Sequence, residues 1–259
     1  MELKNSTILI TGGTSGIGLE FASQLNKLGA TIIITGRNLA SLSDTKRWFS
    51  NIHTIQSDVS NPRDIEKLYE EVTKQFPDLN IIINSAGVMR QIDLYNNEFD
   101  IDKITNEIDT NLSGTIQMVH QFLPHLMKQK SAAIINVSSA IAFMSYSIAP
   151  VYSASKAGVH AYTKALRLQL EKTNVKVFEV LPPGVKTNLQ KDWKIPPPEG
   201  RMMTANKAVA DAIKDILKNK LEITPGLARI LKLLSRIAPN YIEKNVAHKE
   251  FEKLVAQKN

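Results

Sequence analysis

Short apolar runs rich in isoleucine and valine recur along the chain and alternate with longer segments of helical period. The runs are nearly continuous in apolar character, which is typical of strands buried on both faces of a parallel sheet. They occupy residues 7–11, 31–35, 53–56, 80–84, 132–137 and 176–180. Helical period is found at residues 17–28, 62–76, 101–128 and 152–171.

This alternation predicts βαβ units joined by right-handed crossovers. The expected fold is therefore α/β: a Rossmann-like, doubly wound parallel sheet flanked by helices on both faces. The proline cluster IPPPEG at 195–200 interrupts the pattern, but regular segments resume after it, so it is interpreted as a loop. We expect one domain over residues 1–259.

Composition narrows the function classes without naming one. The 259 residues carry a formal net charge of +7, and the lysines are scattered, which favours a solvated basic surface over a nucleic-acid site. With no cysteine, disulfides and thiolate chemistry are excluded, and no HExxH-like pattern suggests a metal. The start of the chain lacks the pattern of a signal peptide and no apolar run approaches the ~18 residues of a membrane span, so a soluble, cytoplasmic protein is expected.

A glycine-rich loop, TGGTSGIG at 11–18, follows the first expected strand and opens a helix. Glycines at such a junction let the backbone approach a phosphate, and the helix N-terminus offers unpaired N–H groups. Many strand-to-helix turns need glycine for steric reasons alone, but the place of this loop in the first βαβ unit favours a nucleotide.

The second strand ends in TIIITGRN, which has Arg37 and no carboxylate. An acidic residue there suits the ribose of NAD, whereas a guanidinium suits the 2′-phosphate of NADP. NADP(H) is therefore predicted, with NAD less favoured. A surface arginine at the start of a loop is the alternative.

The pentapeptide YSASK at 152–156 places Tyr152 and Lys156 one helical turn apart on the same face. This spacing permits a proton-exchanging pair. In a lysine-rich chain it can also arise by chance, so other motifs have to decide.

Seven motifs in order resemble the short-chain dehydrogenase/reductase family over about residues 5–190. They are TGGTSGIG, Asp58 and Val59 in SDVS, NSAG at 84–87, Asn111 in TNLSGT, INVSS at 135–139, YSASK, and PPGVKT at 182–187. PHLMKQ at 124–129 and the doubled proline at 182–183 are most similar to a bacterial subgroup associated with lipoteichoic-acid D-alanylation, which implies no defined substrate. Ser85 departs from the second asparagine usual in the family, and a small effect on the bracing of this strand end is expected.

The resemblance implies NADP-dependent interconversion of a carbonyl and an alcohol. The residues that it implies for catalysis are Asn111, Ser139, Tyr152 and Lys156. Those that it implies for the cofactor are Gly12, Thr14, Ser15, Gly16, Ile17, Gly18, Arg37, Asp58, Val59, Asn84, Ala86, Gly87, Tyr152, Lys156, Pro183, Gly184, Val185 and Thr187.

The chemistry follows from these side chains. Tyr152 would exchange the proton, and a nearby Lys156 cation, together with the positive oxidised nicotinamide, would lower the pKa of its phenol from about 10. Ser139 would hold the substrate oxygen, with Ser138 the less favoured serine. INVSS can also be a strand end satisfying backbone groups, and Asn111 can be either the family's helix brace and water anchor or a polar core residue.

Two segments bear on substrate and partners. Residues 188–203 are expected to fold over a small, mainly hydrophobic substrate, with Trp193, Ile195, Met202 and Met203 beneath and Phe143, Met144 and Tyr146 opposite. The tail, 226–259, contains the basic amphipathic stretch LARILKLLSRI. Packing on its own protein or in a homodimer or homotetramer is favoured over a membrane or partner helix. A nucleotide-binding sensor or scaffold without turnover is the alternative function.

Overall fold

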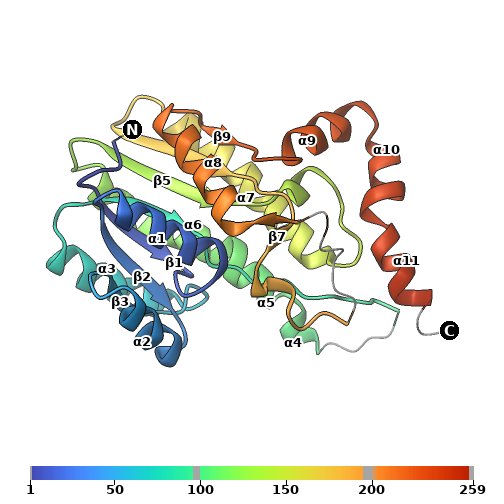
Figure 1. Ribbon diagram of the computed structural model, residues 1–259, viewed down its shortest axis with the longest axis horizontal. Coiled ribbons are helices and arrows are strands. Elements are labelled where there is room, and N and C mark those ends of the chain that lie inside the picture. The colour runs from blue at the N-terminus through green and yellow to red at the C-terminus, as the bar shows by residue number, and fades with distance from the viewer. Residues whose placement is uncertain (1, 96–99, 195–199, 201, 257–259) are drawn as a thin grey trace.

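In a computed structural model of the protein, residues 2–95, 100–194, 200 and 202–256 are described. A seven-stranded parallel sheet forms its centre (Figure 1). Its strand order is β3-β2-β1-β4-β5-β6-β9, so the chain starts in the middle of the sheet and winds outward in both directions. The strands are β1 (Thr7–Thr11), β2 (Thr31–Gly36), β3 (His53–Gln56), β4 (Leu79–Asn84), β5 (Ala132–Val137), β6 (Val175–Val180) and β9 (Glu222–Ile223).

Helices cover both faces of the sheet and bury its isoleucines in two cores. One core lies under α1 (Gly16–Lys27), α2 (Leu39–Trp48) and α8 (Ala205–Leu217). The other lies under α3 (Pro62–Gln75), α6 (Gly114–Leu126) and α7 (Pro150–Gln169). The predicted doubly wound α/β fold is therefore confirmed. The first six strands lie within a residue of their predicted positions. Five of them are mostly buried, and burial on two faces leaves a clear apolar signal, whereas β3 is exposed or only partly buried.

The helix predicted over 101–128 is divided into several pieces. It consists of α4 (Ile101–Ile104), α5 (Asn106–Ile108), a π-helical turn η1 (Asp109–Ser113) and α6. The π turn coincides with Asn111, whose side chain bonds to residues outside the helix. Such bulges are frequent at functional sites.

The remaining elements are short. They are β7 (Val185–Lys186) paired with β8 (Met203–Thr204), the 3₁₀ turns η2 (Ala140–Phe143) and η3 (Asn188–Gln190), and the tail elements α9 (Ala228–Ile237), α10 (Pro239–Ile242), η5 (Glu243–Ala247) and α11 (Lys249–Ala256). The tail descends beside the loop that follows β5 (Figure 1). None of the described helices is long and apolar enough to cross a membrane.

Candidate active site

A cavity of about 880 Å³ lies at the carboxyl ends of the parallel strands. This is the edge at which doubly wound sheets bind ligands. Nearly every residue expected at the site lines it, as do Thr35, Ser57 and Met89. Asn84 and Asn111 do not line it, and both lie buried behind its wall.

The glycine loop fits a dinucleotide phosphate group. Gly12 and Gly16 both have positive φ, +65° and +54°, a region that L side chains rarely adopt. A Cβ on Gly18 would lie 2.4 Å from the Gly12 carbonyl oxygen, so the loop can close against α1 only with glycine there. The first N–H groups of α1 therefore face the cavity at a place open to an anion.

The second strand's end supplies the surroundings expected for an adenosine group. Arg37 and Asn38 line the cavity here, together with Asp58 from the loop after β3. The hydroxyls of Thr35 and Ser57 are buried there without a hydrogen-bond partner among the described residues. Unpartnered buried hydroxyls beside a cavity are consistent with a polar ligand that completes them.

Buried polar side chains brace the strand ends. The hydroxyl of Thr11 accepts hydrogen bonds from the backbone N–H groups of Ser85 and Ala86, each at 3.1 Å. Asn84 donates to Asn136 at 2.8 Å, and Asn136 donates to Thr163 at 2.9 Å. Asn84 thus supports the site from behind, and Ser85 is held through its backbone.

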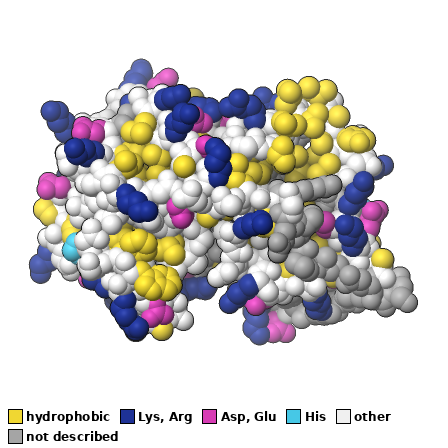
Figure 2. Space-filling view, in the orientation of Figure 1, with side chains coloured by type: hydrophobic (Ala, Val, Ile, Leu, Met, Phe, Trp, Pro, Cys, Tyr) yellow, Lys and Arg dark blue, Asp and Glu magenta, His cyan; other side chains and the backbone are white. Residues whose placement is uncertain are grey.

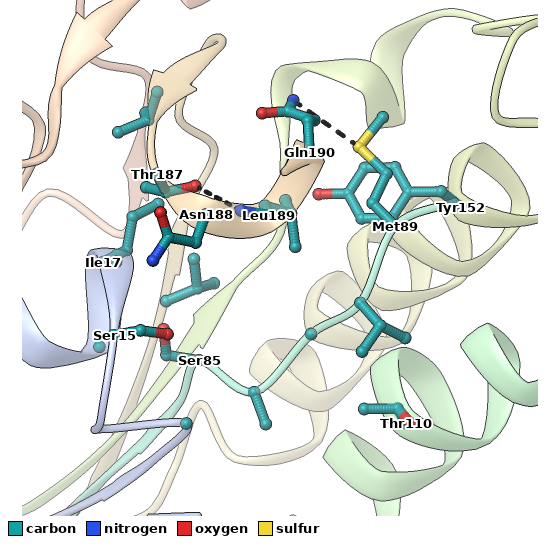
Figure 3. Close-up of a pocket in the computed structure, with 18 of the residues that line it drawn as sticks. Ser15, Ile17, Ser85, Met89, Thr110, Tyr152, Thr187, Asn188, Leu189 and Gln190 are labelled. Atoms are coloured by element: carbon teal, nitrogen blue, oxygen red, sulfur yellow. Dashed lines mark hydrogen bonds between the residues drawn. The ribbon is translucent and has the colours of Figure 1, made fainter. Parts of the chain in front are cut away.

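Tyr152, Lys156 and Ser139 converge at one end of the cavity. Tyr152 and Lys156 are each 5% exposed, and the ammonium of Lys156 lies 5.7 Å from the centroid of the Tyr152 ring. Lys156 Nζ donates to the carbonyl of Val137 at 2.9 Å. The Ser139 hydroxyl acts on the phenol and lowers its pKa, and in Figure 3 the hydroxyl of Tyr152 points into the cavity between Met89 and Leu189.

Burial dominates the proton equilibria of this pair. It raises the pKa of the Tyr152 phenol above its ordinary value, against the lowering effect of the Ser139 hydrogen bond, and the negative charge of Glu107 raises it further. Burial also lowers the pKa of Lys156 to about 8, although the charge of Glu179 opposes this. In the chain without cofactor, burial destabilises the phenolate more than the neighbouring groups stabilise it. The predicted lowering of the phenol pKa counted the charge of the oxidised nicotinamide as well, and it stays a prediction for the cofactor complex.

Asn111 acts as a brace between two segments of the site. Its carboxamide accepts from the backbone N–H of Val88 and donates to the carbonyl of Val88, both at 2.9 Å. It also donates to Ser155 at 3.0 Å. The π turn is thereby tied both to the loop after β4 and to the helix that carries Tyr152.

Apolar side chains surround Tyr152 on the side away from the glycine loop. Trp193 and Met89 belong to this cluster, with Tyr146 partly buried against it. Neither Trp193 nor Tyr146 lines the large cavity, so their predicted contact with the substrate stays a prediction. Leu254, from the last helix, completes the cluster and was not predicted, because a single leucine 100 residues beyond the tyrosine carries no local signal.

Phe143, Met144, Met202 and Met203 were predicted to line the substrate space, and these predictions need correction. The Phe143 ring packs edge-on against His160 at 5.3 Å and lies 5.8 Å from Lys232 Nζ, so it faces the tail and does not line the large cavity. Met144 does not line that cavity either. Met202 and Met203 line a separate cavity of about 400 Å³ beside Gly226. Ile195 lies outside the described residues.

Two buried carboxyl groups near the site were not predicted from the sequence. Glu107 is fully buried; one oxygen accepts from the N–H of Arg90, and the other has no partner in the described part of the chain. Glu179 is fully buried, and both its oxygens lie within 3.0 Å of His160 Nδ1. The available signal for Glu179 was a glutamate between Phe178 and Val180 near the end of an apolar strand.

A doubly wound sheet with a glycine phosphate loop and a buried Tyr–Lys pair defines the class of nucleotide-dependent oxidoreductases. The family model described as short chain dehydrogenase matches residues 6–196, and the chain belongs to this family. It is therefore a dehydrogenase or reductase of this family.

Known proteins similar to the chain agree with this assignment. The uncharacterized oxidoreductase DltE of Bacillus subtilis is 43% identical over 189 residues, which are 73% of this chain and 75% of that protein. The uncharacterized oxidoreductase MW2403 of Staphylococcus aureus is 31% identical over 213 residues, 82% and 90% of the two chains. A short chain dehydrogenase from Burkholderia cenocepacia in complex with NADP superposes with a TM-score of 0.81 at 23% identity, over 93% of this chain and 97% of that one. A short chain dehydrogenase/reductase from Burkholderia phymatum in complex with NAD superposes with a TM-score of 0.79 at 20% identity, over 90% of this chain and 94% of that one.

Proposed function

We propose that the protein is an NADP(H)-dependent oxidoreductase that interconverts a small hydrophobic carbonyl compound and its alcohol. The observation that carries the proposal is the Tyr152 phenol, which is buried, lines the same cavity as Ser139 and is directed into it one helical turn from Lys156. The bound cofactor would supply or accept the hydride.

The side chains have separate roles in this proposal. The Ser139 hydroxyl holds the substrate oxygen, and Tyr152 gives it a proton during reduction. Because burial raises the phenol's pKa, the proton stays on Tyr152 at neutral pH and is available to a developing alkoxide. Lys156, held by the Val137 carbonyl, stabilises the phenolate that remains.

Arg37 supports the preference for NADP(H) over NAD(H). It lines the cavity beside Asn38, and the segment 35–41 contains no carboxylate that would suit a ribose hydroxyl. Replacing Arg37 with Ala is expected to weaken NADPH binding by roughly 10- to 100-fold, the effect of a lost charge-assisted bond, and to leave NADH binding nearly unchanged.

The apolar cluster supports a hydrophobic substrate. Met89, Trp193 and Leu254 gather around Tyr152, so a substrate whose oxygen meets Ser139 would place its remaining atoms among carbon and sulfur atoms.

NADPH consumption with a panel of aldehydes, ketones and quinones tests the activity. Tyr152→Phe should abolish turnover and retain NADPH binding, whereas Tyr162→Phe, on the same helix, should retain both. If no panel member is reduced although NADPH binds tightly, the nucleotide-sensor alternative gains support. If the Tyr152→Phe variant turns over like the wild type, the assigned role of Tyr152 is wrong.

A further inference from the structure

Helix α9 presents an apolar stripe to solvent. Ile230, Leu233 and Ile237 are 53%, 58% and 70% exposed, and Leu227 and Leu234 are also exposed. At 100° per residue these five positions fall on one face of the helix. In Figure 2 hydrophobic side chains gather at the upper right, where Figure 1 places α9.

The opposite face of α9 attaches the helix to the protein. Ala228 is fully buried, and Leu231 and Ser235 are partly buried on the same side. Lys232 forms an ion pair with Glu222 of the edge strand β9 and lies over the Phe143 ring. Because these contacts fix the orientation of α9, the stripe faces outward as part of a defined surface. The described part of the chain does not cover the stripe, so packing on its own protein is wrong for these residues, and the predicted alternative of packing in a homo-oligomer stays a prediction.

Positive charge borders the stripe, and α9 contains no acidic residue. Arg229 and Arg236 are exposed and seven residues apart, so they lie above one another along one edge of the apolar face. Beyond the helix, Tyr241 is 64% exposed and Lys244 is exposed. Aliphatic residues with a basic edge and a neighbouring tyrosine are the composition of helices that lie in the plane of an anionic membrane surface.

We propose that α9 docks the protein onto an anionic lipid surface. The stripe of Leu227, Ile230, Leu233, Leu234 and Ile237 would enter the boundary between headgroups and acyl chains. Arg229 and Arg236 would meet lipid phosphates. A second copy of the chain fits less well, because two copies of α9 would bring together basic edges without a carboxylate from either helix to neutralise them.

Docking would place the substrate end of the molecule near the lipid. Helix α9 packs on η2, the turn that directly follows Ser139. The small cavity lined by Met202 and Met203 reaches Leu227 at the start of α9. The proposed surface is thus adjacent to apolar parts of the site, but it does not depend on the assigned reaction.

Vesicle flotation of the full-length protein tests the proposal, with light scattering as a parallel measure of oligomeric state. The wild type is expected to bind vesicles of mixed phosphatidylcholine and phosphatidylglycerol, to bind phosphatidylcholine alone much less, and to lose binding as salt is raised. The triple variant I230S/L233S/I237S should bind at least about tenfold more weakly. The R229Q/R236Q variant should bind roughly 30-fold more weakly to the mixed vesicles and leaves the packed face untouched.

Matched controls come from other exposed helical positions. Leu39→Ser replaces a leucine that is 60% exposed on α2, and Arg63→Gln with Lys67→Gln removes two exposed charges from α3. Both controls should bind vesicles like the wild type. The proposal is overturned if the wild type does not bind the mixed vesicles, or if both α9 variants bind them as well as the controls do. A wild-type oligomer that fails to bind vesicles and dissociates in the triple variant would assign the stripe to a second copy.

Discussion

Replacing Glu107 with Gln gives a sharp test of the electrostatics behind the site. Glu107 is fully buried, and burial raises the pKa of its carboxyl from 4.5 to about 7, against the lowering effects of the Arg90 N–H bond and the Arg90 charge. A glutamine keeps an oxygen for the Arg90 N–H and removes the charge. The substitution therefore isolates the cost of ionising this position.

The magnitude follows from the two pKa values. At 1.36 kcal/mol per pH unit, a rise from 4.5 to about 7 corresponds to about 3 kcal/mol of folding free energy. Because the folded state holds the proton more tightly, this stabilisation is present below pH 4.5 and is lost as the pH rises through 7. Between pH 4.5 and pH 7 the free energy of unfolding of the wild type should therefore fall by about 3 kcal/mol relative to that of Glu107→Gln.

Urea unfolding of both proteins at several pH values measures this difference. Glu66→Gln, at an exposed position on α3, is the control, and its stability should run parallel to that of the wild type. A second readout is the pH dependence of turnover. The charge of Glu107 raises the pKa of Tyr152, so Glu107→Gln should shift the phenol's titration to lower pH. Stability curves of wild type and Glu107→Gln that run parallel from pH 4.5 to 8 would refute the reasoning.

Three further substitutions test other parts of the site. Gly18→Ala should reduce cofactor affinity by at least about tenfold, because its Cβ would collide with the Gly12 carbonyl; equal affinity by titration would contradict the loop's proposed close approach. Leu254→Ala should cost about 2–4 kcal/mol in urea unfolding and raise KM for a hydrophobic substrate, and an unchanged KM would exclude Leu254 from the substrate wall. Glu179→Gln should lower the pKa of Lys156 further, so the loss of activity at alkaline pH should begin at a lower pH than in the wild type. If activity is lost at the same pH in both proteins, the buried carboxylate does not act on the lysine.

The sequence predicted the parts of the fold that have a strong local signal. Six strands and the long helices carry an apolar pattern that extends over several residues of a strand or several turns of a helix. Their positions could therefore be predicted without information about tertiary contacts. Strand β9 has two residues and the helix around Asn111 is interrupted by a π turn. Neither feature can be read from periodicity, since both depend on contacts made after the chain has folded.

The same division holds for the site. The glycine loop, Tyr152 and Lys156 lie in motifs with fixed spacing, and the structure brings them to one cavity. Glu107 and Leu254 reach the neighbourhood of Tyr152 from distant segments, and nothing in their local sequence marks them. The direction of the phenol's pKa could not be predicted either, because it depends on how completely water is removed from the ring.

The position of α11, whose Leu254 belongs to the apolar cluster at Tyr152, has a consequence for the order in which the protein folds. Every strand of the large sheet lies before residue 224, so a nascent chain could assemble the sheet and the glycine loop while its tail is still being made. The apolar cluster at Tyr152 would still lack Leu254 at that stage. The sheet and the glycine loop can therefore form before the substrate end is complete, and we expect a protein trimmed of its tail to bind nucleotide while its substrate end stays open.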